Sequence, residues 1–348
     1  MKIGLIHNLY GEFSHGGAET AVMLMARELE ESGNEVFLIT TKPRKATPGE
    51  SELKVHYISS RFYNLSATPV VLRIFWHIGE IFSLKYRTIK KILKTEKPDL
   101  VITHNILGLG LLTPLAIRKL KIKHWHFLHD IQLLHPSGLM IFGKEKKLKN
   151  IPAKIYQRIT KGLIASPEKV ISPSEWLLKI HQEKNFFKNS KTEIKPFRWP
   201  QAEKNISDKN KKFKKFLFIG QMEKQKGVFL LIDAFKEINN PDISLTFAFR
   251  HNQQNIAAVK KAADKDKRIS FRGPLDYEQT RELMIASDCL IVPSLCYENS
   301  PTTIHGAKAA GLAVIAAAIG GIPEIIGEEK LFNPGDKKDL IEKIKETL

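Results

Sequence analysis

The chain has 348 residues, of which 43% are hydrophobic and 26% are charged. These proportions are typical of a globular protein and exclude a disordered chain, a collagen-like repeat and a disulfide scaffold. At about 100–200 residues per domain, the length predicts two domains. The net charge of +18 favours a negatively charged partner such as nucleic acid, anionic lipid or a phosphorylated substrate.

Cysteine usage and apolar runs indicate the compartment. Cys289 and Cys296 are too few for a disulfide framework and favour a reducing setting. The apolar run at residues 3–6 is too short for a signal peptide, and the run at 106–117 is broken by glycines and a proline. No stretch reaches the roughly 18 apolar residues of a membrane span. We therefore expect a cytoplasmic protein.

Short apolar runs alternate with helix-like segments along the chain. In the first half, the pattern predicts helices notably at 18–32 and 69–94, and strands at 2–7, 35–40, 54–58, 99–104, 124–129 and 169–172. In the second half, predicted strands are 215–219, 244–249, 268–272, 289–293 and 313–317, and predicted helices are 228–238, 256–264, 277–286, 302–310 and 337–347. Apolar strands alternating with helices favour the α/β class, with two doubly wound, Rossmann-like domains.

The lysine-rich stretch at 201–212 has no periodic apolar face and is the predicted linker. It separates a first domain, residues 1–200, from a second domain, residues 213–348. Doubly wound sheets bind ligands at the carboxyl ends of their strands. We therefore expect a central cleft that both sheets face.

Candidate site residues in the first half follow predicted strands. Gly16 and Gly17 precede a helix, where backbone amides and the helix dipole favour an anion; the alternative is that they only permit a tight turn. His129 and Asp130 end a strand, where they can bond a hydroxyl or phosphate oxygen; the alternative is a strand-end histidine without a ligand.

Two other patterns in the first half do not predict a binding site. His124 and His126 share one face of a strand while His129 points to the other, so the histidines do not converge on a metal. Gly108 and Gly110 approach a dinucleotide fingerprint, but Thr113 stands at the third glycine position. We expect these glycines to serve helix packing.

The second half contains two loops suited to a diphosphate. Gln221 to Gly227 follow the first strand, and Lys226 can reach a phosphate as a point charge; the alternative is an exposed basic turn. Glu298 precedes Pro301, which begins a helix as a proline at the first helical position does. Free amides at that helix start would bind an anion while Glu298 holds sugar hydroxyls beside it.

Motifs in both halves occur in a recognisable order. They are Gly16-Gly17-Ala18-Glu19, His129-Asp130, Phe218-Ile219-Gly220, Lys226-Gly227, Val292-Pro293-Ser294, Glu298-Asn299-Ser300-Pro301, Ala310-Gly311 and Gly320-Gly321-Ile322-Pro323-Glu324. This series, which covers nearly the whole chain, resembles glycosyltransferase family 4, the group 1 glycosyl transferases with the GT-B fold.

The resemblance implies a glycosyltransferase (EC 2.4) that moves a sugar from a UDP- or GDP-sugar to a hydroxyl of a glycan or lipid-linked acceptor, with retention. It implies polysaccharide biosynthesis for the cell envelope, with the donor on the second domain and the acceptor on the first. The implied catalytic residues are His129, Glu298 and Lys226. The implied donor-binding residues are Gly16, Gly17, Gln221, Lys226, Arg250, Glu298, Asn299, Ser300, Pro301, Thr302 and Gly306. No metal or other cofactor is expected, because lysine and amides can stabilise the leaving diphosphate.

The chain departs from the family pattern at three places. Gly306 replaces the second glutamate of the family's E-x7-E motif, Gln221 replaces an arginine, and residues 247–250 replace a Gly-x-Gly turn, where Arg250 can supply a cation. The second domain is also expected to lack the family's terminal helices. The alternative function is therefore an impaired homologue that binds sugar nucleotide or a partner without turnover; a sugar-nucleotide epimerase is a further alternative. A nucleic-acid partner is not expected, because no binding motif accompanies the charge.

Two segments, 69–94 and 144–161, combine apolar side chains with lysines and arginines. Such segments can lie on anionic lipid headgroups, which predicts peripheral contact with the inner face of a cell membrane. The alternative is an amphipathic core helix with a solvated lysine face.

Overall fold

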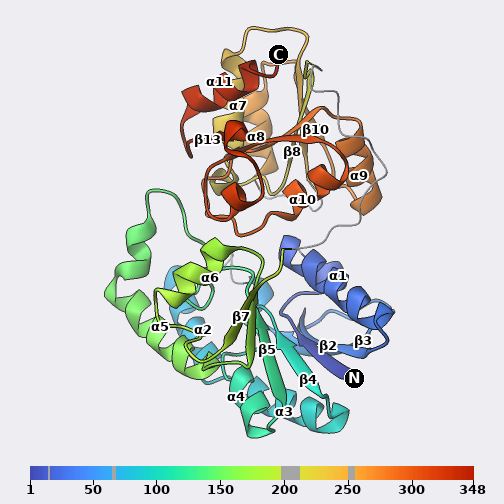
Figure 1. Ribbon diagram of the computed structural model, residues 1–348, viewed down its shortest axis with the longest axis vertical. Coiled ribbons are helices and arrows are strands. Elements are labelled where there is room, and N and C mark those ends of the chain that lie inside the picture. The colour runs from blue at the N-terminus through green and yellow to red at the C-terminus, as the bar shows by residue number, and fades with distance from the viewer. Residues whose placement is uncertain (15, 65–67, 197–211, 250–254) are drawn as a thin grey trace. The chain divides into compact units, whose positions relative to one another are not determined.

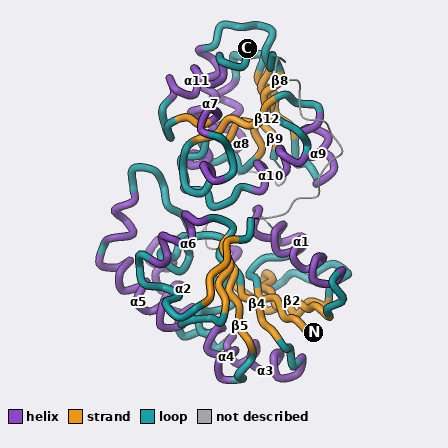
Figure 2. Tube along the Cα trace, viewed as in Figure 1, coloured by secondary structure: helices purple, strands orange, loops and turns teal. Residues whose placement is uncertain are grey.

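The computed structural model describes residues 1–348 except 15, 65–67, 197–211 and 250–254. The chain divides into two compact units. The first contains Met1–Leu139 and Lys146–Lys195, and the second contains Met140–Glu145 and Pro196–Leu348. Each unit is a parallel sheet with helices packed on it, which confirms the α/β class (Figures 1 and 2). The predicted linker, 201–212, lies outside the described residues apart from its last residue.

The first unit is built on a seven-stranded sheet with the order β3-β2-β1-β4-β5-β6-β7, in which all paired neighbours are parallel. Its strands are β1 (Lys2–Ile6), β2 (Glu35–Pro43), β3 (Lys54–Ser60), β4 (Leu100–Thr103), β5 (Lys123–Phe127), β6 (Lys169–Ser172) and β7 (Lys191–Ile194). The strand order reverses between β1 and β4, so the loops after these two strands diverge to opposite sides and leave space at the sheet edge.

The helices of the first unit are α1 (Gly17–Glu31), α2 (Val70–Ile81), α3 (Lys85–Glu96), α4 (Thr113–Lys119), α5 (Ile151–Ile164) and α6 (Glu175–Gln182). Buried side chains of α3 and α4, including Ile89 and Ile117, share one apolar cluster with Ile6, Phe37 and Ile39 of the sheet. This packing holds the strand ends in place.

The prediction of one helix over 69–94 is wrong, because α2 ends at Ile81 and α3 begins at Lys85. At the break, the N–H of Leu111 donates to the carbonyl of Glu80 (3.0 Å). In a continuous helix this carbonyl would accept a hydrogen bond from the helix itself. Gly110 packs here so closely that an added Cβ would lie 2.8 Å from Cβ of Ser83. The short edge strand β7, which is partly exposed and polar, was not predicted.

The second unit is built on a six-stranded sheet with the order β10-β9-β8-β11-β12-β13, again with parallel neighbours. Its strands are β8 (Lys215–Ile219), β9 (Ser244–Ala248), β10 (Ile269–Arg272), β11 (Cys289–Val292), β12 (Ala313–Ala317) and β13 (Leu331–Phe332). Its helices are α7 (Val228–Glu237), α8 (Ile256–Ala263), α9 (Tyr277–Ile285), α10 (Thr302–Ala309) and α11 (Lys337–Lys345). The strand order reverses between β8 and β11.

Residues 140–145 lie in the first half of the chain but pack with the second unit. Ile141 pairs with Cys296 in an antiparallel bridge, and the N–H of Phe142 donates to the carbonyl of Leu295 (2.8 Å). Tyr297 donates its hydroxyl to Glu145 (3.0 Å). The segment therefore supports the loop that follows β11.

Across the parts of the chain that the structure describes, no helix combines the length and the apolar character needed to cross a membrane.

Candidate functional site

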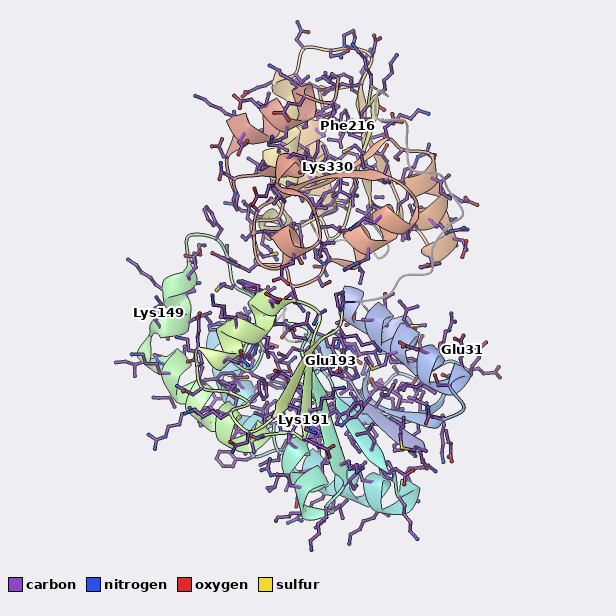
Figure 3. All side chains as sticks on the ribbon, in the orientation of Figure 1. Glu31, Lys149, Lys191, Glu193, Phe216 and Lys330 are labelled. Carbon is purple, nitrogen blue, oxygen red and sulfur yellow. The ribbon has the colours of Figure 1, made fainter. Side chains whose placement is uncertain are left out.

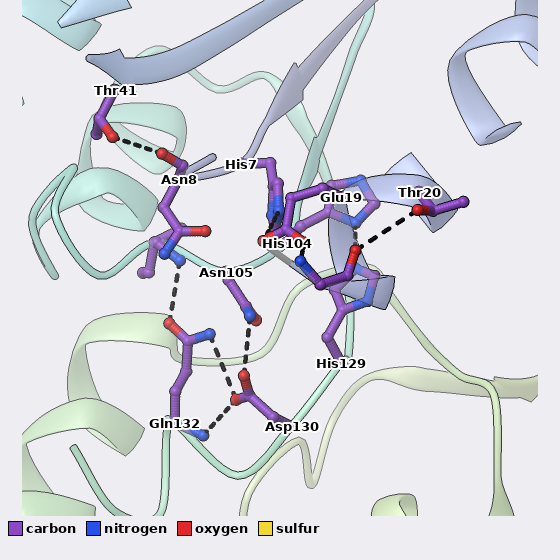
Figure 4. A network of polar contacts seen from close by, with 12 residues as sticks. His7, Asn8, Glu19, Thr20, Thr41, His104, Asn105, His129, Asp130 and Gln132 are labelled. Atoms are coloured by element: carbon purple, nitrogen blue, oxygen red, sulfur yellow. Dashed lines mark hydrogen bonds and ion pairs between the residues drawn. The ribbon is translucent and has the colours of Figure 1, made fainter. Parts of the chain in front are cut away.

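Three histidines gather where the first sheet reverses its strand order. His7 follows β1, His104 follows β4 and His129 lies two residues after β5. Because β1, β4 and β5 are parallel neighbours, their carboxyl ends meet at one edge. His104 Nδ1 and His129 Nε2 are 2.8 Å apart, and the rings of His7 and His129 are 5.7 Å apart between centroids (Figure 4).

Burial keeps two of these histidines uncharged. It lowers the pKa of His129 to about 3, with the neighbouring His7 acting in the same direction, and it lowers the pKa of His104 well below its ordinary value. His104 and His129 therefore share one hydrogen bond between neutral rings. His129 would meet a ligand as a neutral hydrogen-bonding group rather than as a cation.

Glu19 fixes the start of α1 beside these rings. Its Oε2 accepts from the N–H of Gly16 (2.8 Å), which is the N-cap residue of α1, and its Oε1 lies 3.8 Å from His7 Nε2. Burial opposes ionisation of this carboxyl, but His7 and the backbone amides outweigh it and lower the pKa of Glu19 to about 2. The structure thus brings the predicted residues Gly16, Gly17 and His129 to the same strand ends.

Asp130 belongs to a separate hydrogen-bond network. Asn105 Nδ2 donates to Asp130 Oδ2 (2.8 Å), and the N–H of Gln132 donates to Asp130 Oδ1 (2.7 Å). The side-chain oxygen of Gln132 in turn accepts from the N–H groups of Ile106 and Leu107. The loops after β4 and β5 are therefore fastened together. Sequence reasoning missed His7, His104 and Gln132, although the two histidines are the last residues of predicted strands and Gln132 lies three residues after a third one.

His124 and His126 serve the interior of the sheet. Both bond Thr103 Oγ1, at 2.7 and 2.8 Å, which confirms that they share one face of β5. Burial lowers the pKa of His124 to about 3. Within the described ranges, no three His, Cys, Asp or Glu side chains are arranged to hold a metal ion.

A pocket of about 450 Å³ also opens in the first unit, beside α1. Its lining includes Tyr10, Tyr57 and Arg27 together with several glutamates: Glu12, Glu30, Glu50 and Glu52. Tyr10 Oη and Ser51 Oγ are 3.1 Å apart, which ties the loop before β3 to the loop after β1. The pocket shares no residue with the predicted site.

The second unit places Lys226 against Glu298 at its own reversal point. Lys226 follows β8 and Glu298 follows β11, which are neighbours in the sheet. Lys226 Nζ donates to Glu298 Oε1 (2.7 Å), and Ser294 Oγ donates to the same oxygen (2.9 Å). Both charged side chains keep some exposure, 24% for Lys226 and 18% for Glu298.

The electrostatics of this pair favour the charged forms. Burial opposes ionisation of both groups, but each partner's charge outweighs it, so the pKa of Lys226 is raised and that of Glu298 is lowered. An ammonium has three N–H donors, and Glu298 takes one of them. The pair therefore presents a fixed cation that can also face an anion.

Two glycines allow the loops around this pair to approach each other. An added Cβ on Gly227 would lie 1.8 Å from the carbonyl oxygen of Pro293, and one on Gly320 would lie 2.0 Å from that of Glu298. Both have left-handed backbone conformations, with φ of +75° and +64°. The carbonyl of Gln225 accepts from the N–H groups of Leu295 and Cys296, at 2.8 and 3.0 Å, and closes the junction.

The helix α10 begins at Thr302, as the predicted range has it, but Pro301 is its extended N-cap and not the first helical residue that the sequence predicts. Ser300 Oγ lies 2.7 Å from His305 Nε2, a partner that sequence reasoning missed. Burial lowers the pKa of His305 to about 4. Asn299 and Ser300 are buried, and Gly306 is buried within α10.

Two further residues, Gln221 and Arg250, were predicted to bind the donor. Gln221 lies in the loop after β8, where its carbonyl accepts from the N–H of Glu223 (2.8 Å). Arg250 lies outside the described residues.

Sequence comparisons identify the family of this chain. Residues 15–196 match the profile described as Glycosyltransferase Family 4, and residues 201–348 match the profile described as Glycosyl transferases group 1. The chain belongs to glycosyltransferase family 4. A Klebsiella pneumoniae relative, an "uncharacterized 42.6 kDa protein in cps region", is 25% identical over 335 residues, covering 93% of this chain and 87% of the relative. An uncharacterized glycosyltransferase of Methanocaldococcus jannaschii is 23% identical and covers 89% of this chain and 79% of its own length.

Solved structures show that this family 4 chain has the GT-B fold. Sucrose-phosphate synthase from Thermosynechococcus elongatus matches with a TM-score of 0.73 and 19% identity, covering 99% of this chain and 89% of that one. Anabaena HepE, solved with UDP-glucose, matches with a TM-score of 0.67 and 16% identity, covering 99% and 89%. At these identities the likeness establishes the fold.

Gly320→Ala tests whether the close approach between loops is required. The substitution should destabilise the protein by more than Gly11→Ala, because Gly11 has a similar φ of +61° but no atom within 4 Å of an added Cβ. Both variants bear the cost of a left-handed alanine, about 1–2 kcal/mol, and only Gly320→Ala adds a backbone clash. Urea unfolding of both variants measures the difference; equal losses would show that the loops can move apart.

Glu19→Gln tests the ionised carboxyl at the start of α1. The folded-state pKa of about 2 lies below the ordinary 4.5, so the ionised group contributes stability above pH 4.5 that is lost as the pH falls toward 2. That contribution is on the order of 3 kcal/mol near neutral pH. The gap in unfolding free energy between wild type and variant should therefore narrow from pH 7 to pH 3. Glu31→Gln, at an exposed glutamate of the same helix, is the control. A gap that stays constant for Glu19→Gln would contradict the prediction.

Proposed function

We propose that the chain transfers a sugar from a UDP- or GDP-sugar to a hydroxyl of a glycan or lipid-linked acceptor, with retention of configuration. The observation that carries this proposal is the Lys226–Glu298 pair at the carboxyl ends of β8 and β11, beside the start of α10. It combines a fixed cation, a carboxylate and the free amides of a helix N-terminus. Those are the groups that a sugar diphosphate requires.

In the proposed mechanism, Lys226 stabilises the negative charge that develops on the leaving diphosphate. Its orientation is set by Glu298 before the donor arrives, so little reorganisation is needed when the bond breaks. The amides at the start of α10 add donors for the same anion, while Glu298, Asn299 and Ser300 hold the donor sugar. Lysine and amides supply the positive charge, so we propose that no metal is required.

The first unit would present the acceptor. His129 is neutral and can form a hydrogen bond with a sugar hydroxyl. Gly16 and Gly17 begin α1, whose first amides can bind an anion. HepE was solved with UDP-glucose, which supports a UDP-sugar donor. The relative in a cps region supports a role in polysaccharide biosynthesis. A cytoplasmic location stays a prediction from the sequence.

An impaired homologue is the second candidate, and Gly306 favours it. The family pattern expects a carboxylate at this position, but Gly306 is a buried glycine within α10. A missing hydrogen bond to a charged group costs about 1.5–3 kcal/mol, or roughly ten- to a hundredfold in affinity. Such a chain would bind sugar nucleotide weakly or turn it over slowly.

Calorimetric titration of UDP, GDP and ADP tests donor binding. One nucleotide should bind, and Lys226→Ala should weaken that binding by about ten- to a hundredfold because a charge-assisted hydrogen bond is lost. Lys224→Ala is the matched control, since Lys224 lies two residues away in the same turn and is exposed. No binding by any nucleotide, or equal losses in both variants, would sink the proposal.

Gly306→Glu separates the active enzyme from the impaired homologue. If the absent carboxylate limits the chain, the variant should bind nucleotide about tenfold more tightly and hydrolyse donor faster than wild type. Gly306→Gln adds similar bulk without the charge and is the control, and thermal unfolding shows whether each variant folds. Efficient donor turnover by the wild-type chain would eliminate the impaired alternative.

A further inference from the structure

Exposed hydrophobic side chains concentrate on two helices of the first unit. Seven large ones, each more than 45% exposed, lie on α2, on the turn after it and on α5: Leu72, Phe75, Ile78, Phe82, Leu84, Ile151 and Ile155. In the second unit, the described residues contain one such side chain, Phe142. Single exposed hydrophobic residues are ordinary, but a contiguous group marks an interaction surface.

On α2 the exposed side chains form one stripe. Leu72, Phe75, Ile78 and Phe82 are spaced three or four residues apart and therefore lie on the same helix face. Phe75 is 64% exposed and Phe82 is 72% exposed. Ile81 packs against the core cluster instead. These four side chains are thus turned toward solvent, which is not expected of a core helix with a solvated polar face.

On α5 the exposed pair lies opposite the buried residues. Ile151 and Ile155, one turn apart, are 73% and 57% exposed. The buried positions of the helix are Ala153, Gln157, Thr160 and Ile164. Lys154 and Arg158 are exposed and flank the isoleucines on the same side of the helix.

The charged side chains of α5 and of the five residues before it have one sign. Residues 146–164 contain six basic side chains and no Asp or Glu: Lys146, Lys147, Lys149, Lys154, Arg158 and Lys161. The first five are exposed, and Lys149 is labelled on the surface in Figure 3. A positive rim around exposed hydrophobic side chains is complementary to a surface that is negative outside and apolar beneath.

Helices α2 and α5 lie on the same side of the first sheet. Ile81 of α2 and Tyr156 of α5 both pack against one core cluster, which also contains residues of α3 and α4. We call the exposed side chains of α2, Leu84 and those of α5, with the lysines before it, the α2–α5 face.

We propose that the α2–α5 face docks on an anionic lipid bilayer, with its hydrophobic side chains entering the headgroup region and its lysines meeting the lipid phosphates. A second copy of this chain is a poorer occupant, because a two-fold contact would bring the basic residues of 146–164 toward one another. A bilayer offers both an apolar layer and negative charge. This inference goes beyond the transfer reaction and does not depend on it.

Co-sedimentation with phosphatidylcholine vesicles, with and without phosphatidylglycerol, tests the proposal on the full chain. The protein should bind only vesicles that contain phosphatidylglycerol, and binding should fall as salt rises. The triple variant Lys146→Gln/Lys147→Gln/Lys149→Gln should weaken binding about a hundredfold. The double variant Phe75→Ser/Phe82→Ser should weaken it as well, with an unchanged unfolding temperature because both side chains are exposed.

The charge-matched control is Lys261→Gln/Lys265→Gln/Lys267→Gln, which removes three exposed lysines of the second unit. It should bind vesicles as the wild type does. Loss of binding in the control, equal binding to both vesicle types, or no binding to either would overturn the proposal. A dimer in gel filtration that Phe75→Ser/Phe82→Ser dissociates would assign the face to a second copy instead. Nucleotide titration of the same variants should be unchanged, so failure of docking and failure of the proposed transfer reaction are distinguishable.

Discussion

Parallel pairing of β1 with β4, and of β8 with β11, is the constraint on which both candidate sites depend. At each of these pairs the strand order of the sheet reverses, so successive loops leave toward opposite sides. Residues separated by about 70 positions, such as Lys226 and Glu298, then meet at one edge. The same geometry brings His7, His104 and His129 together in the first unit. The candidate functional side chains lie at these edges because the carboxyl ends of parallel strands are all at the same edge of a sheet.

The candidate site of the second unit depends on close contacts between backbone segments. Gly227 and Gly320 have no room for a side chain, and the segment 140–145 braces the loop that carries Cys296 and Tyr297. These contacts hold the two loops together, with Lys226 and Glu298 at hydrogen-bond distance. A preorganised cation of this kind stabilises charge in a transition state more effectively than one that must first be ordered.

The first unit differs in its electrostatics. Burial holds His104 and His129 in their neutral forms, whereas Glu19 remains ionised beside the start of α1. This edge of the sheet therefore offers hydrogen bonds rather than a strong positive field. The positive charge of the unit lies elsewhere, notably around α5, where it surrounds exposed isoleucines. The first unit thus has two different regions: an edge of the sheet with neutral histidines, and a surface at α5 that is both basic and apolar.

The sequence by itself determined the α/β class, most of the strands, the family and the loops that carry Lys226 and Glu298. These features rest on local patterns: apolar strands that alternate with helices, a proline at the start of α10 and an ordered series of glycine motifs. Local patterns can be recognised from the sequence without knowledge of the fold. Only the tertiary structure decided which residues meet. The bond between His104 and His129, the brace formed by residues 140–145 and the break between α2 and α3 depend on contacts between distant segments. The exposed stripe on α2 was equally beyond the sequence, because periodicity shows that a helix has an apolar face but not whether that face is turned toward the core.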